Sequence, residues 1–281
     1  MKLQYLGTAA AEGIPAPFCR CDTCREAARR GGKDLRLRSS ALVNDRLLID
    51  PGPDVYAATL RFRLSLCDVR NAIITHAHSD HFQRELMGAF TPVTAHIAKQ
   101  GDRFHLWGSA FTADVWREYV TTMRMAEPEL ERYVEFHVLK PYETAEIEGI
   151  RVTALKARHS CEGSLLYVLE QGASRLFYGN DTGPMEEENW DWLAQQKGRP
   201  FTLVSLDSTM GFPKNQYYGH MSLQENRETR ERIIRLGAAD EKTHFFCHHF
   251  SHNGLTLHRE TEEAMKPYGF GVAYDGLTLD F

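Results

Sequence analysis

The sequence contains no apolar run long enough to span a membrane, and no apolar N-terminal segment of the kind that directs secretion. It also lacks sequence repeats, low-complexity tracts and long linkers rich in Gly, Pro or Ser. These absences predict one cytoplasmic domain over residues 1–281 that makes no membrane contact, and its 42% apolar residues suffice for a full core. The net charge of −5 provides no broad positive field, which argues against nucleic acid as a partner.

Cysteines are few, but three of the six lie close together as Cys19, Cys21 and Cys24, in a segment at about residues 18–25. Disulfides are not expected in a reducing compartment, so this cluster indicates a thiolate metal site. A tetrahedral zinc ion held by three thiolates needs a fourth ligand from elsewhere in the chain. The alternative is that the cysteines are free and that the loop is merely polar.

Four metal-ligand side chains are packed into the segment His76-Ala77-His78-Ser79-Asp80-His81, which follows a short apolar stretch typical of a buried strand. Side chains two residues apart on an extended segment point the same way, so His76 and His78 can bind one cation together. Asp80 and His81 come after the chain turns, and we expect them to face a second cation. Imidazole and carboxylate ligands suit zinc or a similar divalent ion. The alternative is a histidine-rich surface turn.

The remaining ligands of a two-metal site must come from other parts of the chain, and three further apolar runs end in candidates. Residues 150–157 lead into His159, residues 176–178 lead into Asp181, and residues 245–247 lead into His248-His249. Each candidate alone would be weak, because a lone His or Asp at a strand end is more often a turn or cap residue. The repeated pattern of a strand followed by a ligand predicts a metal centre, with the choice between His248 and His249 left open.

The order of these motifs, from Leu3 to about His252, resembles the metallo-β-lactamase superfamily. Within it, Gly7-Thr8-Ala9-Ala10 and the cysteine segment resemble the PhnP-type phosphodiesterases, which hydrolyse cyclic phosphate esters of ribose phosphates. The resemblance implies an α/β fold of the αββα sandwich type, with two sheets between outer helices and the metals at one edge. Periodicity alone predicts only a mixed α/β domain. The segment at about 109–146 is expected to form either a helical cover near the site or ordinary peripheral packing.

The resemblance also implies a role for each ligand. His76, His78 and His159 would hold one metal, Asp80, His81 and His249 would hold the other, and Asp181 would bridge both. Asp50 would orient a ligand histidine, and His252 would complete the zinc site of Cys19, Cys21 and Cys24. His220 matches the position of a general acid, and we expect it to act in catalysis together with Asp80. Asp207 receives no firm role.

These patterns together predict a metal-dependent hydrolase, in the first place a phosphodiesterase that uses a metal-bridging hydroxide on a small cyclic phosphate of ribosyl or nucleotide type. The expected cofactors are two divalent ions, zinc or manganese, and one structural zinc, and the expected partner is a small phosphorylated substrate. Alternatives with the same fold are a transfer-RNA 3′-processing endonuclease, a lactone or thioester hydrolase, and an accessory protein of the pyrroloquinoline-quinone type. The endonuclease is disfavoured, because such enzymes carry a Gly-rich basic arm that no segment here resembles. The sequence leaves open the identity of the metals and whether the chain forms a homodimer.

Overall fold

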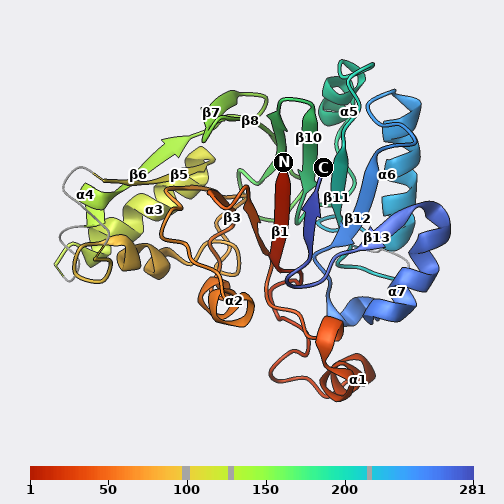
Figure 1. Cartoon of the computed structure of the whole chain (residues 1–281), viewed down its shortest axis with the longest axis horizontal. Coiled ribbons are helices and arrows are strands. Elements are labelled where there is room, and N and C mark those ends of the chain that lie inside the picture. Colours follow the sequence, from red (N-terminus) through yellow and green to blue (C-terminus); the bar gives the residue numbers. More distant parts are fainter. Residues whose placement is uncertain (97–101, 126–129, 214–216) are drawn as a thin grey trace.

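The computed structural model describes residues 1–96, 102–125, 130–213 and 217–281. Two seven-stranded sheets pack against each other, and helices lie on the outer side of each (Figure 1). The first sheet has the order β14-β1-β2-β3-β4-β5-β6, with strands β1 (Lys2–Gly7), β2 (Ser40–Val43), β3 (Leu47–Ile49), β4 (Asn71–Ile73), β5 (Phe104–Gly108), β6 (Val134–Val138) and β14 (Thr278–Asp280). The second has the order β13-β12-β11-β10-β9-β8-β7, with strands β7 (Thr144–Ile147), β8 (Ile150–Lys156), β9 (Leu165–Gln171), β10 (Ser174–Gly179), β11 (Leu203–Asp207), β12 (His244–His248) and β13 (Phe270–Val272).

Both sheets combine a parallel half with an antiparallel half. In the first sheet β3, β4, β5 and β6 are parallel neighbours, and in the second sheet β10, β11, β12 and β13 are parallel neighbours. The carboxyl ends of parallel strands meet at one edge of a sheet, where loops can gather functional side chains. The loops that follow these parallel strands therefore lie where a functional site can form, at one edge of the sandwich.

Three apolar layers hold the sheets and helices together. Between the sheets, Leu3, Tyr5 and Ile73 pack against Val152, Tyr167 and other side chains of the second sheet. The outer layer on the first sheet includes side chains from α2 (Val55–Phe62), α3 (Ala110–Met123) and α4 (Leu130–Tyr133). The outer layer on the second sheet includes side chains from α1 (Asp22–Arg30), α5 (Glu187–Ala194), α6 (Leu223–Arg235) and α7 (His258–Met265). The predicted αββα sandwich is therefore confirmed.

Helix α6 begins at a capping box. Ser222 caps α6, because its hydroxyl accepts from the backbone N–H of Glu225 while the Glu225 side chain accepts from the backbone N–H of Ser222.

The two termini lie side by side at the sheet edge, where the N-terminal ammonium of Met1 donates to the carbonyl oxygen of Phe281 at 2.6 Å (Figure 1). None of the helices in the described residues combines the length and the apolar character needed to cross a bilayer.

The segment at 109–146 differs from the helical expectation. Its first part forms α3 and, after residues 126–129, which lie outside the described residues, α4. Its second part forms β6 and β7, which close the ends of the first and second sheets. The helical expectation is wrong for these strands, because their partly exposed edge positions admit charged and aromatic residues in place of a continuous apolar run.

Candidate metal centre

The predicted ligands converge because each follows a strand that ends at the same edge of the sandwich. The segment from His76 to His81 follows β4, His159 follows β8, Asp181 follows β10 and His249 follows β12. Three site residues, Asp50, Asp181 and His249, have positive φ angles of 54°, 48° and 59°. This left-handed conformation is uncommon for residues other than glycine, and here it turns the chain sharply where a side chain must face the centre.

The first group of ligands consists of His76, His78, His159 and Asp181, whose ligand atoms all lie within 4.8 Å of one another. His76 Nε2 is 2.9 Å from His78 Nδ1, and His159 Nε2 is 3.2 Å from the same atom. Burial, followed by the neighbouring histidines, lowers the pKa of His76 despite the opposing effect of Asp181. Its imidazole is therefore held in the neutral form that a metal needs.

The second group consists of Asp80, His81, Asp181 and His249, and again all ligand atoms lie within 4.8 Å. His81 Nε2 is 3.1 Å from an oxygen of Asp80, 3.1 Å from Oδ2 of Asp181 and 3.4 Å from His249 Nε2. Asp181 is the member that both groups share. Its Oδ2 lies between His76 and His81, at 3.3 and 3.1 Å from their Nε2 atoms.

The chemistry of these donors fits a pair of divalent ions. Asp181 is buried, and although its Oδ1 lies 2.9 Å from His220 Nδ1, this oxygen accepts no well-formed hydrogen bond from the described residues. Burial raises the pKa of Asp181, but His249, His220 and His81 outweigh it and hold the pKa well below its usual value. A buried, charged carboxylate with an unsatisfied oxygen is what a bridging metal ligand requires. Ligand atoms about 3.4 Å apart suit a tetrahedral ion with bonds of about 2.0–2.1 Å, and the nitrogen separations above lie near that value.

Asp50 lies behind the second ligand group, next to His81. Its buried carboxylate accepts from His81 Nδ1 at 2.8 Å, from the backbone N–H of Thr75 at 2.7 Å and from the Asn180 amide at 3.0 Å. These contacts fix the orientation of the His81 ring and tie β3 to β4 and to the strand end that carries Asp181. A carboxylate behind a ligand histidine also makes that ring a stronger donor.

At the end of β12 the structure places His249, and not His248, in the second ligand group. His248 is still part of the ladder, opposite Asp207, and its ring is buried near Tyr5 and Tyr178, where Nδ1 lies 2.9 Å from the Ser205 hydroxyl. Burial and the neighbouring His249 lower the pKa of His248 to about 3. The chain then turns, so His249 faces the centre.

His220 and Asp207 lie beside the second group. His220 Nδ1 is 2.9 Å from Asp181 Oδ1 and 3.2 Å from Asp207 Oδ2, and the same Asp207 oxygen is 3.2 Å from His249 Nδ1. Burial lowers the pKa of His220, but the carboxylates of Asp207 and Asp181 outweigh this effect and raise it to about 11. Asp207 is a site residue to which the sequence assigned no role, although it ends β11 just as Asp181 follows β10. Asp181, Asp207, His220 and His249 also meet the distance condition of a third ligand group.

The cysteine segment lies next to the centre and forms a separate group with His252. Cys21 Sγ and Cys19 Sγ are 3.4 and 3.6 Å from His252 Nδ1, and the ligand atoms of all four residues lie within 4.8 Å. Burial raises the pKa of Cys21, but hydrogen bonds from the Cys24 backbone and from His252 lower it to about 6. Burial raises the pKa of Cys24 to about 12, so of these two thiols only Cys21 favours the thiolate form. The distances within the group suit four-ligand metal binding.

A pocket of about 440 Å³ opens onto both ligand groups and is also lined by Glu12, Tyr217, His220 and Asn253. A smaller hollow of about 270 Å³ adjoins it and shares His159, Ser160 and Tyr217 with it. Arg158 lines this hollow with its guanidinium 4.9 Å from the centre of the Tyr218 ring, and it makes no ion pair within the described ranges. Among the described residues, the side chains that line the hollow offer hydrogen-bond donors and no carboxylate.

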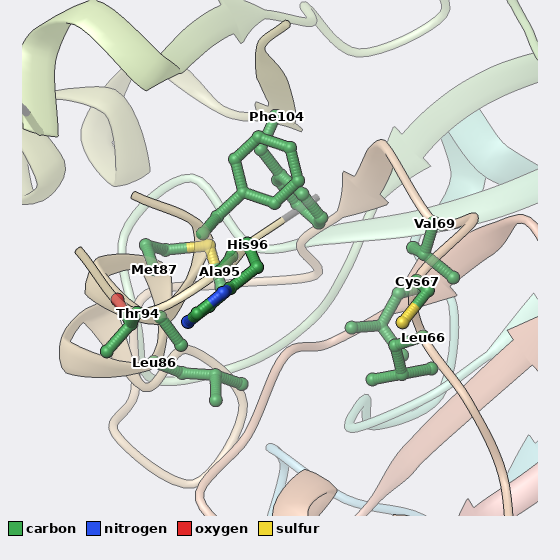
Figure 2. A pocket seen from close by; sticks show the side chains of 12 residues that line it. Leu66, Cys67, Val69, Leu86, Met87, Thr94, Ala95, His96 and Phe104 are labelled. Carbon is green, nitrogen blue, oxygen red and sulfur yellow. The ribbon is translucent and has the colours of Figure 1, made fainter. Parts of the chain in front are cut away.

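A third cavity, of about 390 Å³, is lined mainly by apolar side chains. Figure 2 shows Leu86, Met87 and Phe104 on one side of it and Leu66, Cys67 and Val69 on the other. It belongs to the apolar layer outside the first sheet and contains none of the ligand groups above.

Comparison with known proteins agrees with the fold. A family model described as the beta-lactamase superfamily domain matches residues 45–250. A solved structure of a new diphosphatase from the PhnP family is similar, with 23% identity, a TM-score of 0.75, and coverage of 100% of this chain and 97% of that one. Zn²⁺-bound PqqB from Methylobacterium extorquens has 21% identity, a TM-score of 0.75 and full coverage of both chains. The short form of human tRNase Z has 17% identity and a TM-score of 0.66, and covers 100% of this chain and 99% of its own. No curated protein sequence matches the chain.

Proposed function

Because the chain belongs to the β-lactamase superfamily, we propose that it is a metal-dependent phosphodiesterase that hydrolyses a small cyclic phosphate ester of ribosyl or nucleotide type. The observation that carries this proposal is the position of His220. This histidine lies 2.9 Å from Asp181, the carboxylate that both ligand groups share, and it lines the pocket that opens onto them. A phosphodiester with an alkoxide leaving group needs such a proton donor.

In this proposal, His76, His78 and His159 would hold one divalent ion, Asp80, His81 and His249 would hold the other, and Asp181 belongs to both ligand groups. Two ions held in this way supply a hydroxide nucleophile at neutral pH and neutralise charge on the phosphoryl oxygens. Cys19, Cys21, Cys24 and His252 hold a third ion, zinc, that stabilises the fold.

The residues of the chain supply the remaining steps. His220 donates its proton to the leaving alkoxide, while Asp207 keeps the ring oriented and charged. Against the effect of burial, the carboxylates of Asp207 and Asp181 raise the pKa of His220, which favours the protonated form that a general acid needs.

The hollow around Arg158 suits the substrate class. It adjoins the pocket on the side of Gly219, the residue before His220, and its lining of guanidinium and hydroxyl groups is suited to an anion. A ribosyl phosphate has such an anionic group on the sugar that carries the leaving oxygen. This arrangement favours a small phosphorylated molecule as the substrate.

The test is a substrate series on metal-reconstituted protein: 2′,3′-cyclic nucleotides, a ribosyl 1,2-cyclic phosphate, bis-p-nitrophenyl phosphate, precursor transfer RNA and a lactone. We expect hydrolysis of the cyclic phosphates and of the nitrophenyl ester. His220→Ala should slow the cyclic substrates, which have poor leaving groups, by about a hundredfold or more. It should affect the nitrophenyl ester much less, because nitrophenolate hardly needs a proton.

The exposed His244, which belongs to none of the ligand groups, provides the matched control as His244→Ala. Equal losses on both substrates together with missing metal would make His220 a ligand, and the proposed mechanism would lose its acid. Cleavage of the lactone or of precursor transfer RNA in place of the cyclic phosphates would refute the proposed substrate class.

A further inference from the structure

Strands β5 and β6 place four side chains in a square on one face of the first sheet. The strands are parallel, with His105 opposite Glu135 and Trp107 opposite His137. Phe104 and Leu106, which alternate with His105 and Trp107, pack into the outer layer that contains α3. The square therefore lies on the face turned away from α3, because successive side chains of a strand point to opposite faces.

Three corners of the square bring metal-ligand atoms together. His105 Nδ1 is 2.9 Å from His137 Nε2 and 3.9 Å from Glu135 Oε2, and all three atoms lie within 4.8 Å of one another. Ligand atoms of a tetrahedral ion with bonds of about 2.0–2.1 Å are about 3.4 Å apart. The observed separations lie on both sides of this value, so changes of less than 1 Å in side-chain position bring the three atoms to one ion.

Two of the three ligand side chains are partly exposed, and Trp107, at the fourth corner of the square, restricts the His137 ring. The side chains of His105 and Glu135 are 33% and 41% exposed, so an ion and its waters can reach them. The Trp107 ring stacks on His137 at 4.1 Å, and its indole N–H donates to Asn71 at 3.0 Å. Trp107 thus holds the His137 ring in place.

We propose that His105, Glu135 and His137 form a binding site for a zinc-class divalent ion that links β5 to the edge strand β6. Both imidazoles bind as neutral rings, with their protons on His105 Nε2 and His137 Nδ1, and water completes the coordination. Two imidazoles and one carboxylate are a donor set suited to zinc and copper. The contrasting interpretation is a direct hydrogen bond between the two rings, with Glu135 held only by Arg103 at 2.9 Å.

The experiment uses the full chain with its other sites already loaded, titrated with Zn²⁺ and, separately, with Cu²⁺. Wild-type protein should bind one equivalent of Zn²⁺ beyond those of the active-site and cysteine groups, and its Tm should rise by a few degrees when Zn²⁺ is in large excess over Kd. Cu²⁺ should quench the fluorescence of Trp107, which is in contact with a ligand ring, and Trp107→Phe should remove this response.

His105→Gln and His137→Ala should each lose the additional equivalent, whereas the control His244→Ala should keep it. His105→Gln leaves the stacked pair of Trp107 and His137 intact, so it tests binding even if His137→Ala is unstable. The proposal is overturned if wild-type protein binds no additional equivalent, or if both variants of the group still bind it. Because these residues line neither the pocket nor its hollow, the result is independent of phosphodiesterase activity.

Discussion

Replacing Asp207 by Asn separates proton donation from metal binding. One oxygen of Asp207 contacts both His220 Nδ1 and His249 Nδ1 at 3.2 Å, and the carboxylate also accepts from the backbone N–H groups of Thr209 and Met221. The amide keeps the size of the side chain but removes its charge. A hydrogen bond to a charged partner contributes about 1.5–3 kcal/mol. We therefore expect Asp207→Asn to reduce kcat/KM for a cyclic nucleotide by roughly tenfold to a hundredfold.

The pH profile provides the second measurement. Burial lowers the pKa of His220, and Asp207 is the first of the groups that raise it. Removing that charge lowers the pKa, so the protonated acid is lost at a lower pH than in the wild-type protein. The alkaline limb of the profile for the cyclic nucleotide should therefore move to lower pH. The profile for bis-p-nitrophenyl phosphate should move much less, because its leaving group needs no acid.

The metal content of Asp207→Asn shows whether Asp207 acts on His220 or is itself a metal ligand. His249 Nδ1 is also 2.7 Å from the Thr209 hydroxyl, so the ligand ring keeps a partner in Asp207→Asn, and two active-site equivalents should remain at saturating metal. Asp68→Asn, at an exposed position, is the matched control. A variant that loses both substrates equally and lacks one metal would refute the reasoning and make Asp207 part of the ligand set.

The remaining predictions concern the metals themselves. Asp181→Ala should lower activity by orders of magnitude and remove more than one equivalent of active-site metal, and retention of two equivalents would contradict the bridging role. Cys21→Ser should remove one equivalent and lower Tm while the folded protein keeps much of its turnover, since structural zinc contributes to folding. His249→Ala should lose active-site metal, whereas His248→Gln should keep it and lose stability, because His248 is buried against Ser205. Metal analysis with thermal unfolding checks all three.

The features that could be predicted from the sequence are those in which neighbouring residues act together. His76 to His81 and Cys19 to Cys24 each place several possible ligands within six residues, so their spacing alone predicts metal binding. The choice between His248 and His249 could not be made in this way, because it depends on where β12 leaves its ladder. Asp207 gave no distinctive signal, since one Asp at a strand end resembles any turn residue until the fold brings His220 and His249 to it.

The group of His105, Glu135 and His137 was also beyond reach of the sequence. Thirty-two residues separate its two histidines, and only the register of β5 against β6 brings them together. The same register was hidden because no strand was expected at residues 134–138. A ladder partner cannot be assigned until both strands have been recognised.

The left-handed conformations of Asp50, Asp181 and His249 have a consequence for protein engineering. Each such conformation costs of the order of 1 kcal/mol or more for a residue with a side chain, so the strand ends are held in a shape that an isolated peptide would avoid. Glycine would adopt the turns easily but would delete the donors. Grafting this centre onto another scaffold therefore requires more than copying its donor residues. The recipient must already contain three sharp strand exits at one edge, or the transplanted residues will relax and point away from their ions.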